Sequence, residues 1–223
     1  MTFTKQQIVA AMAETGLVPL FSHDDAAKSQ AVLEAAYRGG VRVFEITNRK
    51  ANSFEIFKHL RSVANDLPGM MLGIGTIMDA KTTRKFIEAG ADFIISPILK
   101  LEMAQVCHDH NVHWMPGCAT LTEIVTAKEH GAEVIKVFPG SVLGPQFVSS
   151  IMPVVPDLKL MITGGVEPTM ENLTGWFKAG ALCVGMGSHL TTKDVIANND
   201  WAGLQKKVEE ILTLIKRIRG NSF

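Results

Sequence analysis

The sequence predicts a single (β/α)8 barrel that spans residues 1–223, with one extra helix before the first strand and another at the C-terminus. Short runs of β-branched and aromatic residues recur about every 20 to 28 residues, and each leads into a stretch with helical periodicity. Nothing marks a topological switch or a dinucleotide-binding glycine fingerprint, so an open doubly wound sheet fits the pattern less well than a closed barrel.

The expected elements follow one another in a regular order. Strands are predicted at 17–21, 42–47, 70–75, 93–96, 113–115, 133–138, 159–163 and 182–185, with the sequences LVPLF, RVFEIT, MMLGIG, FIIS, HWM, EVIKVF, KLMIT and LCVG. Helical periodicity predicts helices at 5–14, 26–39, 53–64, 80–89, 100–110, 121–130, 170–179 and 201–219. Gly90, Gly131 and Gly180 each follow one of these helices, where a left-handed C-cap favours glycine.

Composition and charge indicate that the partner is a small molecule. The chain has 22 Lys and Arg residues against 22 Asp and Glu residues, and 47% of its residues are hydrophobic. A hydrophobic fraction of this size is enough to fill one sizeable core. No cluster of basic residues is larger than the solvent-exposed face of an ordinary helix. We therefore expect neither a nucleic acid nor a membrane as a partner.

The three cysteines, Cys107, Cys118 and Cys183, favour a reducing compartment. Their number is odd and no Cys-x-x-Cys spacing occurs, which argues against a disulfide framework and against a thiolate metal site. The N-terminal segment MTFTKQQ is too polar for a signal peptide, and no apolar run approaches the ~20 residues that a membrane helix needs. A soluble, unprocessed cytoplasmic protein is the expectation.

Lys136 is the most informative residue for function. It lies within the apolar segment VIKVF, directly before the loop Pro139-Gly140-Ser141. If this strand is buried, the ammonium form is disfavoured and the pKa of the lysine falls, so its amine becomes a nucleophile near neutral pH. An edge strand whose lysine faces water is the alternative.

Polar residues at several strand ends are expected to meet at one face, because the carboxyl ends of all strands in a barrel share that face. Glu45 and Thr47 point inward if side chains alternate along 42–47, and Lys136 points inward by the same parity. Glu45 and Lys136 then face one another across the barrel mouth. A structural buried ion pair is the alternative, although such pairs add little stability.

Other strand ends are suited to holding an anion. Arg49 follows the second strand and offers a planar fork for a carboxylate or a phosphate. The seventh and eighth strands lead into Thr-Gly-Gly-Val at 163–166 and Gly-Met-Gly-Ser at 185–188. In barrels of this kind, the loops after these two strands commonly bind phosphate through their backbone amides.

Two further groups are weaker candidates. His108, Asp109 and His110, with His113 nearby, resemble a metal cluster, but they precede the fifth strand and so lie at the opposite rim. Cys118 has no base beside it in the sequence, so we expect a small buried hydrophobic residue rather than a nucleophile. No metal site is predicted.

Seven motifs together resemble one known family. They are FEITNR at 44–49, GIGT at 73–76, ISP at 95–97, MPGCAT at 115–120, IKVFPG at 135–140, TGGV at 163–166 and GS at 187–188. In order and spacing they are similar to the 2-keto-3-deoxy-6-phosphogluconate (KDPG) and 4-hydroxy-2-oxoglutarate (KHG) aldolase family, over residues 5–215. The resemblance implies a class I lyase that cleaves a 2-keto-4-hydroxy acid into pyruvate and an aldehyde, without a metal or other cofactor, as a homotrimer of barrels.

The resemblance also implies a role for each matching residue. Lys136 looks like the Schiff-base lysine, and Glu45 looks like the general acid and base. Arg49 and Thr76 match positions that hold the pyruvyl carboxylate. The other substrate-binding positions line the pocket or hold a phosphate, and they are Gly75, Pro97, Phe138, Gly164, Gly165, Gly187 and Ser188.

Departures from the family pattern leave the substrate open. Lys50 and Ala51 stand where Thr-Pro is common, and Leu121 stands where proline is common. The expected reaction releases pyruvate and glyceraldehyde 3-phosphate from the gluconate or galactonate form of a 2-keto-3-deoxy-6-phospho sugar acid. The alternatives are an aldolase that splits 4-hydroxy-2-oxoglutarate into pyruvate and glyoxylate, a noncatalytic barrel that binds sugar phosphates, and a barrel isomerase.

Overall fold

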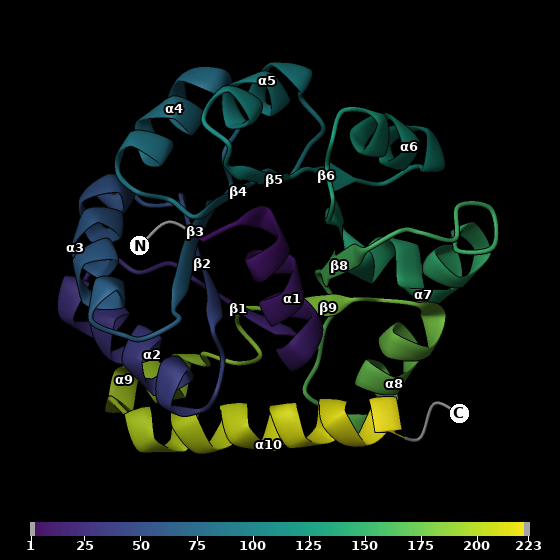
Figure 1. Ribbon diagram of the computed structural model, residues 1–223. Helices are drawn as coiled ribbons and strands as arrows, with labels where there is room; N and C mark the ends of the chain where they lie inside the picture. The colour runs from purple at the N-terminus through teal and green to yellow at the C-terminus, as the bar shows by residue number, and fades with distance from the viewer. Residues whose placement is uncertain (1–2, 221–223) are drawn as a thin grey trace.

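A curved sheet of parallel strands forms a nearly closed barrel in the computed structural model, which describes residues 3–220 (Figure 1). The strands are β1 (Leu17–Phe21), β2 (Val43–Thr47), β3 (Met71–Gly75), β4 (Phe93–Ile95), β5 (His113–Met115), β6 (Gly117–Cys118), β7 (Ile135–Val137), β8 (Leu160–Thr163) and β9 (Cys183–Met186). Their order in the sheet is β5-β4-β3-β2-β1-β9-β8-β7-β6. With helices between the strands, this is the predicted (β/α)8 barrel.

The ninth strand arises because the fifth predicted strand is broken in two. Proline has no N–H to give to a sheet, and Pro116 separates β5 from β6. β5 pairs with β4, whereas β6 pairs with β7. The carbonyl of Pro116 still accepts a hydrogen bond from the Lys136 backbone N–H at 2.9 Å. β5 and β6 therefore connect the two halves of the sheet, with the interruption at Pro116 between them.

The helices surround the barrel in Figure 1, and most of them match the predicted segments. They are α1 (Lys5–Thr15), α2 (Ala26–Arg38), α3 (Ser53–Asn65), α4 (Ala80–Glu88), α5 (Leu101–Asp109), α6 (Leu121–Glu129), α7 (Gly140–Ile151), α8 (Met170–Ala179), α9 (Lys193–Asn198) and α10 (Trp201–Gly220). The left-handed conformation expected at three glycines is confirmed, with φ of +93° at Gly90, +82° at Gly131 and +111° at Gly180.

Side-chain caps explain where several helices begin. The side chains of Thr4, Asp25, Asp79, Thr120 and Thr169 each accept a hydrogen bond from the backbone N–H three residues later. Each bond satisfies a donor that the first turn of a helix leaves unpaired. At Asp25, Asp79, Thr120 and Thr169, the loop that leads from a strand into the helix is therefore anchored at its downstream end.

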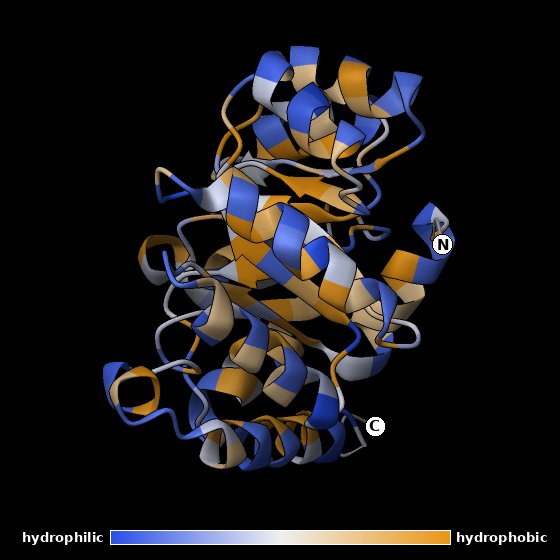
Figure 2. Cartoon of the chain, turned by 90° about the vertical axis from the view of Figure 1, so that its left-hand side faces the viewer, coloured by the Kyte–Doolittle hydropathy of each residue, from blue (hydrophilic) through white to orange (hydrophobic). Residues whose placement is uncertain are grey.

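The core has two layers that meet at the barrel wall. Inside the barrel, Ile8 and Met12 of α1 pack with strand residues such as Val43 and Phe93. Outside it, Phe44 and its counterparts on other strands pack against the helices, and Figure 2 shows hydrophobic strands beneath helices that are largely hydrophilic on the outside. Because Val43 begins β2, α1 covers the N-terminal end of the barrel. The carboxyl ends of the strands are left for a site.

The C-terminal helix α10 docks on the barrel, as its periodicity predicted. Its buried residues are Leu204, Val208, Ile211, Ile215 and Ile218, and it packs against α2 and α8. Although α10 has 20 residues, neither it nor any other helix within residues 3–220 is apolar enough to cross a membrane.

Candidate active site

Glu45 faces the barrel interior from the middle of β2. Its neighbours Phe44 and Ile46 join the hydrophobic layer beneath the helices, so the predicted alternation of this strand is confirmed. The residue is 0% exposed, and neither carboxylate oxygen has a hydrogen-bond partner within residues 3–220. Burial raises the pKa of Glu45, and the positive charges of Lys136 and Arg49 oppose this shift.

Gly75 provides the space for the Glu45 carboxylate. It stands on β3, which pairs with β2 so that Gly75 lies opposite Thr47. A Cβ atom at position 75 would lie 1.6 Å from Glu45 Oε1, less than half of an ordinary contact distance. Glycine at this position is therefore a condition for the carboxylate to occupy the place where it is seen.

Lys136 is buried in the middle of the sheet rather than exposed at its edge. β7 pairs with β6 on one side and β8 on the other, and Lys136 is 5% exposed. Its Nζ atom lies 5.2 Å from the centroid of the Phe138 ring. Burial lowers the pKa of Lys136, and the charge of Glu45 opposes the shift. The edge-strand alternative is wrong.

Glu45 and Lys136 influence one another without forming a hydrogen-bonded ion pair. Each shifts the pKa of the other, yet the carboxylate oxygens of Glu45 accept no hydrogen bond from any described residue. A buried polar group without a partner is rare in a folded protein and calls for a ligand or a chemical role. This arrangement favours function over the structural ion pair.

A cavity of about 750 Å³ opens at the carboxyl ends of the strands, and neither Glu45 nor Lys136 is among the described residues that line it. Thr47 and Phe138 line it, and each stands two residues beyond Glu45 or Lys136 on the same face of its strand. The volume is typical of a small-molecule site. The cavity brings together six predicted site residues, namely Arg49, Phe138, Gly164, Gly165, Gly187 and Ser188.

The cavity wall favours an anionic ligand. Arg49, Lys50 and Lys193 line it, together with His23 and His189, and no aspartate or glutamate is found among the described residues that do so. Basic side chains around a partly closed space concentrate positive potential there.

The two glycine loops differ in why they contain glycine. Gly164 and Gly165 have φ of +90° and +69°, which other residues rarely adopt, and a Cβ at Gly165 would lie 2.8 Å from Ser141 Cα at the start of α7. At Gly187 the nearest atom to such a Cβ is the Leu20 carbonyl oxygen at 3.6 Å. The first loop therefore needs glycine for its own conformation, whereas the second has room beside its backbone.

Three predicted substrate-binding residues lie elsewhere at the barrel mouth. Gly75 is beside the Glu45 carboxylate, as described above. Thr76 has the left-handed φ of +61° and is half-buried at the end of β3. The Pro97 carbonyl carbon would lie 2.4 Å from a Cβ at Gly117, so Pro97 lies against β6. Thr76 and Pro97 are not part of the cavity wall, and their binding roles stay predictions.

The structure adds cavity residues that were not predicted to bind the substrate, although Thr163 belongs to the TGGV motif. His23 follows β1, Thr191 and Lys193 lie before and at the start of α9, and Thr163 ends β8 with a buried hydroxyl that has no partner within residues 3–220. The rule that chemistry gathers at carboxyl strand ends would have found His23 and Thr163. Nothing in the sequence marked Lys193, because α9 is too short for a helical period.

The weaker candidates take no part in this cavity. His108 and His110 are exposed, whereas His113 is buried and its pKa is lowered to about 3 by burial. The described residues contain no group of three His, Cys, Asp or Glu side chains placed to hold a metal ion. Cys118 is 1% exposed, and burial raises its pKa to about 12. Its predicted role as a small buried hydrophobic residue is confirmed.

Comparison with known proteins points to one family. Residues 8–207 match the family model described as "KDPG and KHG aldolase". The chain is 30% identical to the 2-dehydro-3-deoxy-phosphogluconate aldolase of Pseudomonas aeruginosa over 201 residues, which are 89% of each protein. It is 36% identical to the 2-dehydro-3-deoxy-6-phosphogalactonate aldolase of Escherichia coli over 121 residues, which are 54% of this chain and 58% of that protein.

A solved structure agrees with the sequence relatives. The 2-keto-3-deoxy-6-phosphogluconate aldolase of Zymomonas mobilis ZM4, in a structure with 3-phosphoglycerate, superposes with a TM-score of 0.79 at 26% identity. The match covers 93% of this chain and 95% of that one.

Proposed function

The chain belongs to the KDPG and KHG aldolase family. We propose that it cleaves a 2-keto-3-deoxy-6-phospho sugar acid to pyruvate and glyceraldehyde 3-phosphate through an imine on Lys136. It is an aldolase, and so a carbon–carbon lyase. The observation that carries the proposal is that Glu45 and Lys136 are both buried, each two residues before a residue, Thr47 or Phe138, that lines a cavity with basic side chains.

Burial prepares Lys136 for the first step. Because its pKa is lowered, a larger share of the side chain is the neutral amine at neutral pH. The Nζ lone pair attacks the C2 ketone and forms a carbinolamine. Glu45, whose pKa is raised, gives a proton to the departing hydroxyl, so that water leaves and a protonated imine remains.

The imine then accepts the electrons of the bond that breaks. As the C3–C4 bond cleaves, its electron pair moves into an enamine, and the C4 hydroxyl loses its proton to Glu45 while C4 becomes the aldehyde. After the aldehyde leaves, Glu45 gives this proton to C3 of the enamine. Water hydrolyses the resulting imine, which frees pyruvate and restores the Lys136 amine. The steps balance without a cofactor.

Several features support a phosphorylated substrate. Two glycine loops and basic side chains line one cavity, and a family member has been solved with 3-phosphoglycerate. Arg49 is suited to a carboxylate, and the loops at Gly164 and Gly187 are suited to the distal phosphate. The hydroxyl of Thr163, which has no hydrogen-bond partner within residues 3–220, stands in the cavity wall and suits a substrate hydroxyl. The second candidate is 4-hydroxy-2-oxoglutarate, because the family description includes it.

Steady-state kinetics with a coupled assay for pyruvate test the proposal. We expect kcat/KM to be highest for the gluconate or galactonate form of the phosphorylated acid, and lower for 4-hydroxy-2-oxoglutarate, which lacks the phosphate. Lys136→Met should abolish pyruvate release, whereas Lys128→Met, at an exposed lysine on α6, should not. Normal turnover by Lys136→Met would refute the mechanism. Equal kcat/KM for phosphorylated and unphosphorylated acids would refute the substrate.

We further propose that residues 1–223 act as one barrel domain, in a homotrimer within a reducing cytoplasm. The family resemblance supports the trimer. Three cysteines that are buried and free support the compartment. Light scattering of the purified protein tests the trimer, and a mass of one or two chains would refute it.

A further inference from the structure

β1 ends between the two parts of the cavity wall that we propose to hold the substrate carboxylate and the phosphate. In the sheet, β1 lies between β9, whose loop carries Gly187 and Ser188, and β2, whose loop carries Arg49. Pro19 of β1 pairs with Met186 of β9, so the chain that follows β1 runs beside the Gly187 loop. His23 stands two residues after β1 and lines the cavity.

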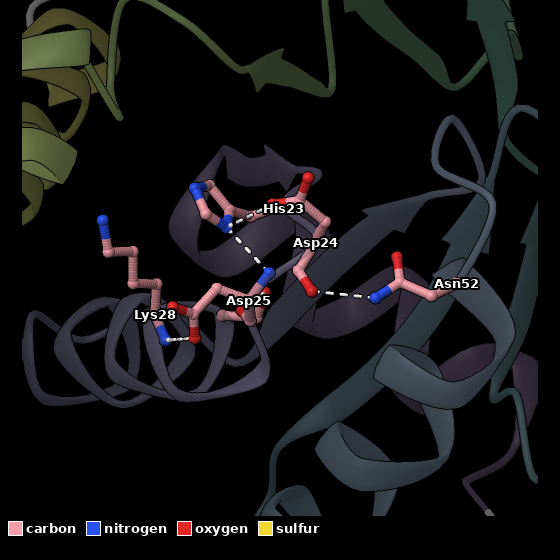
Figure 3. Close-up of polar contacts among 6 residues, drawn as sticks. His23, Asp24, Asp25, Lys28 and Asn52 are labelled. Atoms are coloured by element: carbon pink, nitrogen blue, oxygen red, sulfur yellow. Dashed lines mark hydrogen bonds and ion pairs between the residues drawn. The ribbon is translucent and has the colours of Figure 1, made fainter.

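The His23 ring is held in place from two sides. It stacks on the Phe21 ring, with centroids 6.0 Å apart and planes 6° apart. Its Nδ1 atom accepts a hydrogen bond of 2.9 Å from the backbone N–H of Asp25, the N-cap of α2. Figure 3 shows the contact between His23 and Asp25, and it shows Asn52 of the neighbouring loop, which donates to the carbonyl of Asp24 at 2.8 Å. The side chain is 25% exposed, so it is partly enclosed.

The contacts of Nδ1 determine what Nε2 can do. Because Nδ1 accepts from a backbone amide, the neutral ring carries its hydrogen on Nε2. Nε2 is therefore a donor in the ring form that the Asp25 contact favours. It donates to no described residue.

We propose that His23 donates from Nε2 to the phosphate group of the substrate and determines the selectivity for phosphorylated 2-keto acids. This inference rests on the proposed function. His23 adds a side-chain donor from the segment after β1 to a cavity wall that also contains the glycine loops and basic side chains such as Lys193. Because the plane of the ring is fixed, the N–H bond at Nε2 has a fixed direction. A hydrogen bond to a charged acceptor is stronger than one between two neutral groups.

Two substitutions distinguish the contribution of the Nε2 hydrogen-bond donor from that of the aromatic ring. His23→Phe keeps the aromatic ring and its stack on Phe21 but removes both nitrogens, whereas His23→Gln places an amide N–H near the position of Nε2. For the phosphorylated acid, we expect His23→Phe to lower kcat/KM about 10- to 100-fold, mainly through KM. Its kcat/KM for 4-hydroxy-2-oxoglutarate and its rate of imine formation with pyruvate should stay unchanged. His23→Gln should recover much of the loss.

The remaining outcomes are also decisive. His130→Phe, at an exposed histidine that ends α6, is the control and should match the wild type in every assay. Wild-type kinetics for His23→Phe, or an equal loss with both substrates, would overturn the proposal. Calorimetry with inorganic phosphate adds a readout that needs no turnover, and His23→Phe should weaken this binding. If the wild type does not cleave the phosphorylated acid, the proposed substrate is wrong. The affinities of the wild type and of His23→Phe for inorganic phosphate then still test the role of His23.

Discussion

Gly75→Ala tests whether the position of the Glu45 carboxylate is essential to the reaction. The new Cβ would lie 1.6 Å from Glu45 Oε1 and 2.4 Å from its Cδ atom. To restore ordinary contact, the carboxylate must withdraw by about 2 Å. A misplacement of this size is expected to cost about 100-fold or more in kcat, because the general acid and base no longer reaches the substrate. Overpacking should also lower the free energy of unfolding by about 1–3 kcal/mol.

Pyruvate release, coupled to lactate dehydrogenase, measures the first effect, and urea unfolding measures the second. Gly175→Ala is the matched control, since its Cβ would lie 3.5 Å from Pro145 Cγ, an ordinary contact, within α8. The control should keep full activity and gain up to about 1 kcal/mol of stability from helix propensity. Full activity of Gly75→Ala in a folded protein would refute the argument that Glu45 acts from this position.

Three other substitutions address the charged residues inside the protein. Glu45→Gln keeps the shape of the side chain but cannot exchange the proton, so kcat should fall about 10²- to 10⁴-fold, and a fall below 10-fold in steady-state assays would contradict its role. Lys136→Met removes a buried amine whose charged form is disfavoured, so its free energy of unfolding relative to the wild type should be more favourable at about pH 7 than at higher pH. Because the pKa of Lys136 is lowered from 10.5 on folding, the unfolded chain binds more protons between the two values, and wild-type stability rises with pH across that window. In urea unfolding, the difference in free energy between Lys136→Met and the wild type should therefore change in favour of the wild type towards about pH 10, and a constant difference would contradict the lowered pKa. Asp92→Asn removes the carboxylate that accepts from Arg61 Nη1 at 2.6 Å and from the Leu72 N–H at 2.7 Å, at the N-terminal end of the barrel. Its unfolding free energy should fall by about 3–5 kcal/mol with kcat unchanged, and an unaltered urea midpoint would count against this account of the pair.

The fold could be predicted because each strand repeats the same local pattern. In β2 and β7, alternation along a short apolar run was enough to place Glu45 and Lys136 inside the barrel. The break at Pro116 was missed, because it depends on which neighbouring strand each half meets. The helix α7 was missed for a local reason: Gly144 with φ of +71° and Pro145 interrupt its periodicity.

The site was predictable only where its residues lie on strands. Parity and strand order bring Glu45 and Lys136 together, whereas the cavity wall also depends on loops whose paths follow from tertiary contacts. His23 is an example, because its orientation follows from a stack on Phe21 and a bond from the Asp25 amide. The need for glycine at position 75 likewise depends on a distance between two strands.

Trapping of the imine with borohydride tests whether Lys136 is the residue that attacks the substrate ketone. The protein is incubated with pyruvate and borohydride, and its intact mass is compared with that of Lys136→Met under the same conditions. Reduction of an imine leaves a stable secondary amine on the lysine. We expect a single pyruvate adduct on the wild type, located at Lys136 by peptide mapping, and none on the variant. An unmodified wild-type protein would contradict imine chemistry and favour a sugar-phosphate binder or an isomerase, and an equal adduct on both proteins would assign the chemistry to another lysine.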